Sequence, residues 1–589
     1  MNHLSSLLKT GKFRRAATAF LLSLFTFTLY LAGCSRTGPS KDADASFSAF
    51  TRQMFRTEVA GNTISLHYTL QNPSGYDIKD APVTYGDFGT DPAAAIASVE
   101  NCTAALHRHD PSRLSGQNRL TYEVIDSYLE NAASGAEYLL YQEPLSPVTG
   151  LHAQLPVILS EYRFRSADDV ATYLELLART GEYFDSLISF EQAKSRAGLF
   201  MPDYQVDSIT SQCRSFVGMG DKNYLYTTFA ERLKTLNNLS ENEKKAFISQ
   251  NKAMIKEVIF PAYLRLTDAL EKLKGSGKNE NGLCFLPDGK AYYEYLVRQC
   301  TGIAEPIPSL QSMTKMQILE DLAAVEKILF PTARSSAEDS VLESTPPTSM
   351  LNDLKNKMTA AFPEPPSVEY CVKYVPSAME EYLSPAFYMI PAIDDISENV
   401  IYINKGQTAS GLNLYTTLAH EGYPGHLYQT VYYSSRNPDP MRSLLDFGGY
   451  TEGWATYAEM MSYYMAPISK TEATLLQKNS SVLLGLYSLA DMGIHYEGWN
   501  LNRTAAFFRD YGITDIQVVR SIYELIIGNP GNYLKYYLGY LEIFNLKKEI
   551  AAELGPDFSQ KDFHKAVLDV GPAPFAIVKE QVRKALSVK

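Results

Sequence analysis

The pattern of apolar positions along the chain predicts a mainly helical protein. Apolar residues recur three and four positions apart over long stretches, for example in 170–190, 241–274 and 314–329. This spacing places them on one face of an α-helix, the face that a folded core covers. Strand patterns are rare, and the clearest is the β-branched and aromatic run at 399–404. We therefore expect a mainly α fold with a small β element next to the histidine motif described below.

The chain of 589 residues is long enough for one large two-lobed domain or for several smaller ones. The segment 331–349 is rich in Ser, Pro, Thr and Glu and poor in apolar residues, which is typical of a surface loop. It divides the chain into a predicted N-terminal helical lobe, 46–350, and a predicted C-terminal lobe, 351–589, that holds the chemistry. Because no repeat of fixed period is visible, we treat 46–589 as one continuous domain.

The first 33 residues have the pattern of an export signal. A basic start is followed by an apolar stretch at 16–31 and by LAGC at 31–34. The last four residues resemble a bacterial lipobox, in which the cysteine becomes the acylated first residue of the mature protein. We therefore expect a signal peptide at 1–33, lipidation of Cys34, a flexible tether at 34–45 and anchoring to the outer face of a bacterial membrane. The alternatives are a plain cleaved signal and a membrane helix, but the apolar stretch is shorter than the ~20 residues that span a bilayer.

Charge and cysteine content exclude several classes of protein. The formal net charge is -12, so nucleic acid is not an expected partner. Besides Cys34, five cysteines lie at scattered spacing, which indicates neither a disulfide framework nor a cysteine-ligated metal site. A single bridge, for example between Cys284 and Cys300, stays open, and the sequence does not indicate an oligomeric state.

The strongest chemical signal is the segment LAHEGYPGH at 418–426. It begins like the zinc-protease signature His-Glu-x-x-His, in which a four-residue step puts two imidazoles on one helix face and the glutamate activates water. Here His420 and His426 are six residues apart, about 600° of helical rotation, so a regular helix keeps them apart. The intervening Pro424 and Gly425 favour a kinked turn. We therefore predict that the helix carrying His420 distorts before His426.

A third ligand is expected from the segment YTEGWATYAE at 450–459. A zinc site with two histidines needs one more protein ligand, and Glu452 follows His426 on a later predicted helix. An unpaired carboxylate would be costly in this apolar, aromatic run. The alternative is a solvated carboxylate on a helix surface. Glu459 lies two turns further along the helix on about the same face. There it is expected to orient a ligand histidine without itself touching the metal.

These motifs resemble the bacterial domain-of-unknown-function family 885. The shared pattern is His-Glu-x-x-Pro-Gly-His followed by Glu-Gly-Trp-Ala-x-Tyr-Ala-Glu, and the likeness extends along most of the mature chain, including 286–293 and 563–568. The family is regarded as zinc metallopeptidases of the gluzincin type. The resemblance implies a large two-lobed helical fold with a deep cleft, one Zn²⁺ per chain on His420, His426 and Glu452, and Glu421 as the catalytic base.

Two further motifs that match the family supply candidate groups for the transition state. His495 lies four residues after Asp491, so the pair is expected to share a helix face, with Asp491 fixing the tautomer and His495 donating to the oxyanion or the substrate backbone. A surface pair is the alternative. Tyr536 follows NPGN at 529–532, where the family usually has Pro-Gly-Gln-Ala, and is a candidate phenol donor. Its alternative is simple core packing.

Four residues are expected to bind substrate. Both tryptophans of the chain, Trp454 and Trp499, lie in Glu-Gly-Trp motifs, which favours a shaped pocket, although bulky aromatics also pack cores. Tyr402 and Asn404 belong to the predicted strand, whose edge is expected to pair with an extended peptide.

The sequence therefore predicts a zinc-dependent peptidase that hydrolyses oligopeptides, with carboxypeptidase and dipeptidase activity among the options. Glu421 is expected to take the proton of the attacking water and deliver it to the leaving amine. Two alternatives come from other classes: a non-catalytic cell-envelope lipoprotein that binds peptides or glycans, and a glycosidase that uses Glu452 and Glu459 as paired carboxylates. Neither alternative explains the two motif histidines.

Overall fold

The computed structural model describes residues 40–329, 342–375, 380, 384–407 and 410–588. Contacts within the chain divide these residues into an N-terminal unit, 40–108 and 135–280, and a C-terminal unit, 109–134 and 281–588. The division places 281–329 and 342–350 with the metal motifs, in contrast to the lobe boundary expected at 350, because the helix at 307–329 packs along the helix at 470–495. The predicted signal peptide and Cys34 lie outside the described residues.

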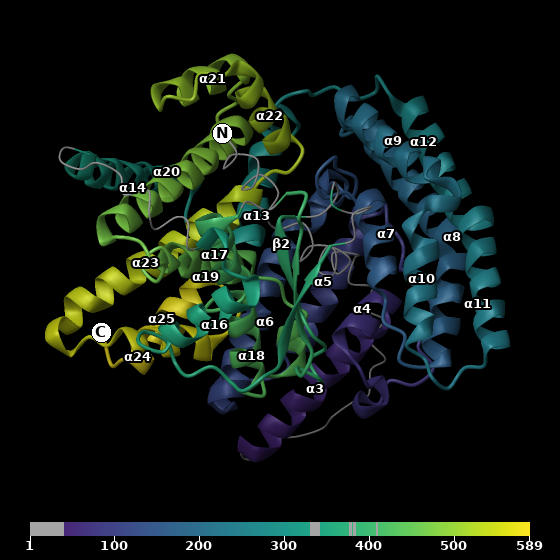
Figure 1. Ribbon diagram of the computed structural model, residues 1–589, viewed down its shortest axis with the longest axis horizontal. Coiled ribbons are helices and arrows are strands. Elements are labelled where there is room, and N and C mark those ends of the chain that lie inside the picture. Colours follow the sequence, from purple (N-terminus) through teal and green to yellow (C-terminus); the bar gives the residue numbers. More distant parts are fainter. Residues whose placement is uncertain (1–39, 330–341, 376–379, 381–383, 408–409, 589) are drawn as a thin grey trace. The chain divides into compact units, whose positions relative to one another are not determined.

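The described residues of the N-terminal unit form helices joined by loops, with no strand among them. Its long helix α8 (Ala167–Ala197) begins at a capping box between Ser166 and Asp169, and it packs against α11 and α12. Figure 1 shows this group of helices in blue and teal. The predicted helical periodicity at 170–190 and 241–274 is thus confirmed. The expected flexible tether at 34–45 is wrong for residues 40–45, which belong to a helix that begins at Ser40. The α-helices of this unit are α3 (Ser40–Ala60), α4 (Thr63–Thr69), α5 (Pro92–Leu106), α7 (Leu151–Glu161), α8, α9 (Asp203–Gly218), α10 (Tyr224–Lys234), α11 (Glu241–Met254) and α12 (Phe260–Leu273).

The C-terminal unit combines helices with a small sheet. Helix α19 (Gly448–Ser462) contacts both α17 (Gly411–Glu421) and α23 (Asn532–Leu554), and α20 (Lys470–His495) packs against α14 (Ile307–Leu329) and α23 (Figure 1). The α-helices of this unit are α6 (Gly116–Gly135), α13 (Gly289–Thr301), α14 (Ile307–Leu329), α16 (Pro347–Met358), α17 (Gly411–Glu421), α18 (His426–Ser434), α19 (Gly448–Ser462), α20 (Lys470–His495), α21 (Leu501–Asp510), α22 (Ile516–Ile527), α23 (Asn532–Leu554), α24 (Gln560–Val570) and α25 (Phe575–Ala585). The predicted mainly α fold is confirmed.

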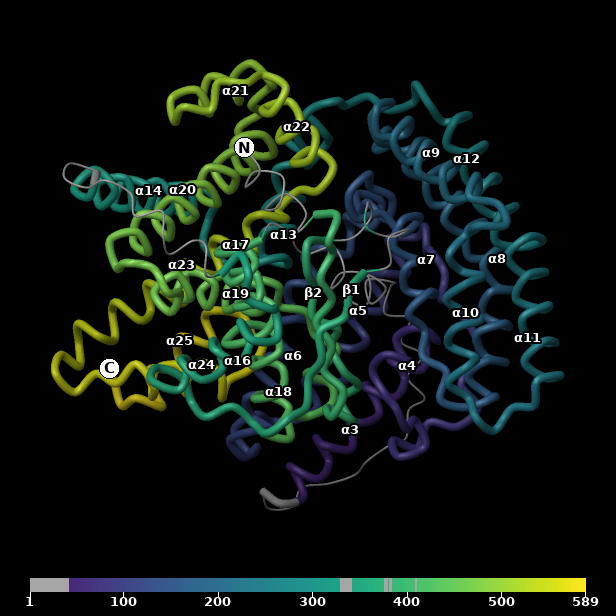
Figure 2. The backbone as a smooth tube through the Cα atoms, in the orientation of Figure 1, coloured from purple at the N-terminus to yellow at the C-terminus, as the bar shows by residue number. Residues whose placement is uncertain are grey.

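Within the described residues the sheet has three strands in the order β1-β3-β2, where β1 is Tyr370–Tyr374, β2 is Ala386–Met389 and β3 is Asn399–Ile403. Strand β3 pairs with β1 in parallel and with β2 antiparallel, and all five of its residues are buried. The predicted strand is therefore confirmed, but its role is not. Because both edges of β3 are already hydrogen-bonded, the expectation that a peptide pairs along it is wrong. Helix α17 packs against β2, and Figure 2 traces the two strands β1 and β2.

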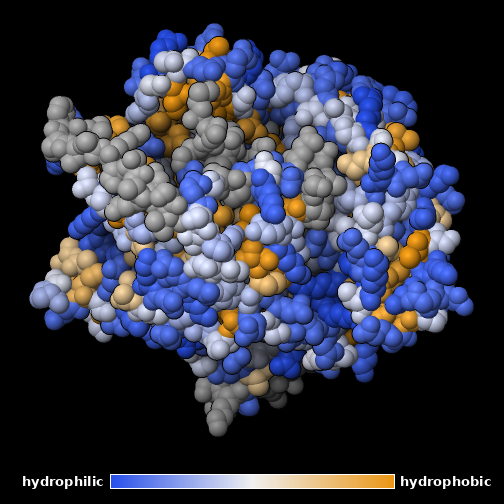
Figure 3. All heavy atoms as spheres, in the orientation of Figure 1, coloured by the Kyte–Doolittle hydropathy of each residue, from blue (hydrophilic) through white to orange (hydrophobic). Residues whose placement is uncertain are grey.

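The described residues contain neither a disulfide nor a membrane-spanning helix. Cys102, Cys213, Cys284, Cys300 and Cys371 are all free, so the bridge between Cys284 and Cys300 is not formed. In the part of the chain that the structure covers, no helix is both long and apolar enough to cross a bilayer. The face in Figure 3 is mainly hydrophilic, with scattered hydrophobic side chains.

Candidate metal centre

His420 and Glu421 are the last two residues of α17. The helix ends because Gly422 adopts φ -111° and ψ -101°, outside the helical region. A Cβ at Gly422 would lie 2.4 Å from a methyl carbon of Leu351 and 2.8 Å from the carbonyl oxygen of Leu418. Both His420 and Glu421 are buried. Gly422 therefore ends the helix directly after the first two candidate residues, His420 and Glu421.

The turn at 422–425 brings the second histidine back to the first. It contains a cis peptide bond between Tyr423 and Pro424, and α18 then begins at His426. A Cβ at Gly425 would lie 1.9 Å from the carbonyl oxygen of His420, so this close approach requires glycine. The ring centroids of His420 and His426 are 4.8 Å apart and nearly perpendicular. The predicted distortion is confirmed, and it is a complete break between two helices.

Helix α19 supplies the third group. The Glu452 Oε2 atom lies 3.2 Å from His426 Nε2 and 3.6 Å from His420 Nε2. Oε2 and the Nε2 atoms of two rings that lie six residues apart therefore converge on one buried point. The side-chain donor atoms of His420, Glu421 and His426 also lie within 4.8 Å of one another.

Glu459 holds His420 from the opposite side of its ring. The Nδ1 atom of His420 lies 3.1 Å from Glu459 Oε2, seven residues after Glu452 on the same helix. If Nδ1–H donates to this carboxylate, Nε2 of the neutral ring carries the lone pair that faces Glu452. Two lone pairs then point at each other, and only a proton or a cation between them makes the arrangement favourable.

The approach of α19 to α23 depends on glycines at the contact. A Cβ at Gly453 would lie 2.5 Å from the Cα atom of Gly539, and a Cβ at Gly539 would lie 2.0 Å from the carbonyl oxygen of Gly449. Because the backbones come this close, α23 places Lys535 and Tyr536 beside the cluster. The Lys535 Nζ atom is 3.8 Å from Glu452 Oε1, and the Tyr536 ring centroid is 6.3 Å from that of His420.

Strand β2 positions the candidate base. The backbone N–H of Tyr388 donates to Glu421 Oε2 over 2.9 Å. Since β2 is at the edge of the sheet in the described chain, the Tyr388 N–H points away from β3 and toward α17. This hydrogen bond fixes the Glu421 carboxylate beside the two histidines.

The electrostatics of the cluster favour a bound cation. Burial by itself raises the pKa of Glu452, but Lys535 and the two imidazoles hold that pKa well below its ordinary value. Burial lowers the pKa of His420, whereas the carboxylates of Glu452 and Glu459 raise it to about 10. Positive charge is therefore stabilised between the histidines and Glu452, either as protons or as a metal ion. Nitrogen and oxygen donors of this kind fit Zn²⁺.

The structure places Asp491 and His495 in packing roles. His495 Nε2 donates to the carbonyl oxygen of Ile526 over 3.0 Å, and its Nδ1 accepts the N–H of Leu283 over 3.2 Å. Asp491 accepts the Tyr293 hydroxyl at 2.6 Å and the N–H of Gly531. The expected pairing of Asp491 with His495 is wrong, because neighbouring elements engage both side chains instead, and His495 is no longer a candidate oxyanion donor.

The two tryptophans make separate contacts. Trp454 is fully buried, and its Nε1–H donates to the carbonyl oxygen of Pro424 over 2.9 Å. Trp499 packs against Gly493 and donates to Glu497. The expectation that Trp454 touches substrate is wrong, because core side chains surround its ring. It supports the turn between the histidines instead.

Tyr402 and Asn404 also serve the fold. The Tyr402 ring stacks on Phe387 with centroids 4.9 Å apart. The Asn404 amide donates to the carbonyl oxygen of Glu380, and its oxygen accepts the N–H of Gly406. Both residues are buried in these contacts, so their predicted substrate role is not supported by their placement.

Tyr388 and Lys535 lie at the candidate centre but were not predicted from the sequence. Tyr388 acts through its backbone, which no side-chain motif reveals. Lys535 did carry a signal, because it is a single cation in the apolar and aromatic run 533–546 at the start of α23. A lysine in such a run is costly to bury without an acidic partner.

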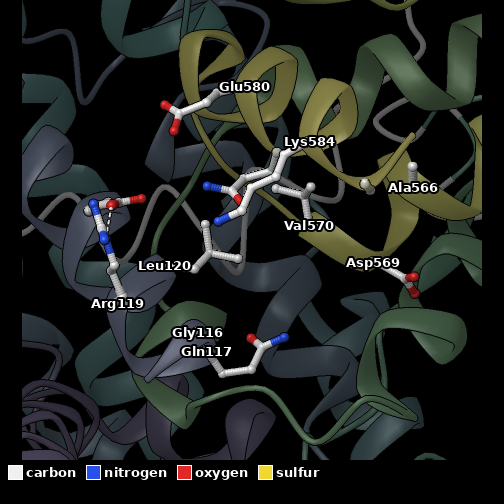
Figure 4. Close-up of a pocket in the computed structure, with 12 residues that line it drawn as sticks. Gly116, Gln117, Arg119, Leu120, Ala566, Asp569, Val570, Glu580 and Lys584 are labelled. Atoms are coloured by element: carbon white, nitrogen blue, oxygen red, sulfur yellow. Dashed lines mark hydrogen bonds and ion pairs between the residues drawn. The ribbon is translucent and has the colours of Figure 1, made fainter. Parts of the chain in front are cut away.

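A separate hollow lies between α6, α24 and α25, away from the candidate centre. Its volume is about 370 Å³ (Figure 4). Three of its charged side chains already have partners: Arg119 and Glu123 pair with each other, and Asp569 pairs with Lys565 and Arg436. None of the predicted site residues lines it.

The fold and the cluster together define a mainly α-helical protein with a buried site of histidines and glutamates on α17, α18 and α19. Residues 87–582 match the family described as bacterial protein of unknown function (DUF885), and the chain belongs to that family.

The comparison with solved structures finds the same fold in several chains, among them the following two. One, from Colwellia psychrerythraea, is described as a "putative lipoprotein"; it has a TM-score of 0.77 and 18% identity over 92% of this chain and 99% of that one. The other, from Shewanella oneidensis, is described as a "putative lipoprotein of unknown function"; it has a TM-score of 0.61 and 17% identity over 92% and 99%. No curated protein matches the chain at a significant level.

Proposed function

We propose that this protein is a metal-dependent peptidase that hydrolyses oligopeptides. The main support is geometric: His420 Nε2, His426 Nε2 and Glu452 Oε2 converge on one buried point, and Glu421 lies beside them. Two imidazoles and one carboxylate are a ligand set of catalytic zinc sites. His420, His426 and Glu452 would hold the ion, and Glu459 would keep the His420 ring in the tautomer that binds it.

The residues around the centre have distinct roles in this proposal. A bound zinc ion supplies Lewis acidity toward the scissile carbonyl and toward water. Glu421, oriented by the N–H of Tyr388, takes the proton of the attacking water and passes it to the leaving amine. Tyr536 is the candidate donor to the oxyanion, since its ring lies beside His420.

The edge of β2 that faces away from β3 is the part of the sheet nearest the candidate base, because its Tyr388 N–H donates to Glu421 Oε2. An extended substrate is proposed to pass beside this edge to reach Glu421, without pairing with the Tyr388 N–H that the base already uses. This assignment replaces β3, whose two edges are occupied by β1 and β2.

Metal analysis and matched substitutions test the proposal. We expect about one zinc per purified chain, and we expect Glu421→Gln to retain the metal while activity on a peptide library falls by ~10²- to 10⁴-fold, the usual size of a general acid–base contribution. Glu452→Gln should lose the metal. Glu497→Gln is the control, because Glu497 begins the second Glu-Gly-Trp motif and pairs with Gln311 and Arg503.

The same experiments separate the rival functions. A chain that binds zinc yet cleaves no peptide would support the non-catalytic binding protein. A glycosidase is disfavoured, because the ring of His420 lies between the Glu452 and Glu459 carboxylates, where a glycosidase would hold the scissile bond. Single-residue or dipeptide release would identify an exopeptidase, and internal cuts an endopeptidase.

We further propose that the chain is exported and anchored through Cys34. The LAGC sequence at 31–34 supports this, as do the two proteins of the same fold that carry lipoprotein descriptions. Labelling cells with a fatty-acid analogue should mark the protein, and Cys34→Ser should abolish the label and release the chain from membranes. Unchanged labelling of Cys34→Ser would refute the anchor.

A further inference from the structure

Lys535 is buried at the edge of the candidate metal centre. Its side chain is 5% exposed, and its stem lies against Gly448, where an added Cβ would be 3.4 Å from Lys535 Cδ. Its Nζ atom is 3.8 Å from Glu452 Oε1 and lies 4.9 Å from the centroid of the Tyr536 ring. Burying an ammonium group is expensive unless a carboxylate compensates it. The carboxylate that Lys535 faces here is a candidate metal ligand.

The two oxygens of Glu452 face different partners. Oε2 faces the Nε2 atoms of both His420 and His426, whereas Oε1 faces Lys535. A glutamate held in this way presents one oxygen to a metal ion. The second oxygen is kept on the side of α23, where the ammonium group attracts it.

The balance of charges at the centre also assigns a role to Lys535. Glu421, Glu452 and Glu459 bring three carboxylates to the two histidines, which are neutral when they bind a metal. A divalent ion compensates two of these negative charges. Lys535 supplies the remaining positive charge, so the loaded centre is neutral only when the ammonium group is present.

We propose that Lys535 is a positioning residue that restricts Glu452 to metal binding through Oε2 alone and balances the charge of the loaded centre. The inference rests on the proposed metal-dependent function. If Glu452 bound the metal through both oxygens, it would occupy an additional coordination position. Lys535 keeps that position open by holding Oε1 away.

The test compares Lys535→Met, which removes the charge and keeps the stem, with Lys535→Arg, which keeps the charge. Lys548→Met is the matched control, because Lys548 lies on the same helix and pairs with Glu320 at the surface. Each full-length protein is loaded with Co²⁺, and metal content, visible absorption and kcat/KM are measured. Cobalt reports ligand number, since its visible bands weaken as coordination rises from four toward six.

We expect Lys535→Met to bind one Co²⁺ per chain with weaker visible bands and with kcat/KM lower by about 10- to 100-fold, as is usual for residues that orient metal ligands. Lys535→Arg should restore the bands and most of the activity, and Lys548→Met should match the parent protein. If Lys535→Met does not fold, Lys535→Gln takes its place.

Two results would overturn the inference: a Lys535→Met spectrum and kcat/KM equal to those of the parent, or loss of cobalt from a folded Lys535→Met protein. If the parent protein itself binds no cobalt or zinc, the metal-dependent function fails. That outcome is distinct from a parent that binds metal and a variant that behaves identically.

Discussion

The indole N–H of Trp454 donates a 2.9 Å hydrogen bond to the carbonyl oxygen of Pro424. Trp454 lies two residues after Glu452 on α19, and Pro424 lies in the turn between the two candidate histidine ligands. The bond therefore links the helix of the third ligand to the turn that spaces the first two. The ring of His564 meets the Trp454 ring edge-on and completes the buried contact.

Replacing Trp454 by Phe should weaken both the fold and the metal site. The change leaves the buried Pro424 carbonyl without this donor, and such a loss costs about 1–3 kcal/mol. Urea unfolding should show this decrease, and zinc competition with a chelator should show weaker binding. Trp499→Phe is the matched control, because the Trp499 N–H donates to Glu497, remote from the ligands in sequence. Equal zinc affinity in both variants would contradict the role of the Trp454 bond.

Gly425→Ala should prevent the turn from forming in its present shape. The added methyl would lie 1.9 Å from the carbonyl oxygen of His420, which belongs to the backbone and cannot move aside alone. We expect loss of zinc binding, measured by metal analysis of the purified protein. Gly116→Ala is the control, because a Cβ there meets nothing within 4 Å. A Gly425→Ala protein with full metal content would mean that the turn tolerates a different path.

Glu459→Gln should reduce metal affinity without removing a ligand. The carboxylate accepts from His420 Nδ1 at 3.1 Å, and an amide holds the tautomer less firmly. Partners of this kind usually contribute about 10- to 100-fold to metal affinity. Chelator competition measures the change. An affinity equal to that of the parent would show that the His420 ring is oriented by its packing alone.

The metal-free C-terminal unit should lose stability on acidification because of two buried imidazoles. Burial lowers the pKa of His495 to about 4 and that of His564 to about 3. Both rings are ordinary titrating groups when unfolded, near pKa 6.5, so the unfolded chain binds more protons below that pH. The free energy of unfolding should fall by about 1.4 kcal/mol per pH unit for each ring between pH 6 and 4.5.

Tryptophan fluorescence follows this transition, since Trp454 and Trp499 both lie in the C-terminal unit. His564→Gln removes one titrating ring, and its unfolding free energy should depend on pH less steeply by about 1.4 kcal/mol per unit. Carboxylates contribute equally to both proteins and cancel in the comparison. Parallel pH profiles for the two proteins would refute the contribution of His564.

The sequence predicted correctly those features that depend on local spacing. Helical periodicity marked α8 and α14, and the β-branched run marked β3. The six-residue step with Pro424 and Gly425 predicted that the helix must break, since a proline and a close-packed glycine act on the backbone around them. Each of these inferences uses residues within a few positions of one another.

Long-range contacts decided the rest. Asp491 and His495 have the spacing of a helix pair, yet Tyr293, Leu283 and Ile526 arrive from other elements and engage them. The β-branched and aromatic residues of β3 would suit either an edge strand or a central strand. Its pairing with both β1 and β2 makes it the central strand. A side chain's chemistry is local, but its partners are set by packing.

By itself the sequence determined the helical class of this protein and the types of donor that it brings, because periodicity and side-chain chemistry are properties of short segments. Only the tertiary structure decided that Glu452 and Glu459 face opposite nitrogens of one histidine, that β2 holds the candidate base, and that Lys535 faces the outer oxygen of Glu452. These relationships arise where α17, α19, α23 and the sheet meet, and the close backbone contacts of Gly425, Gly453 and Gly539 fix that meeting in space.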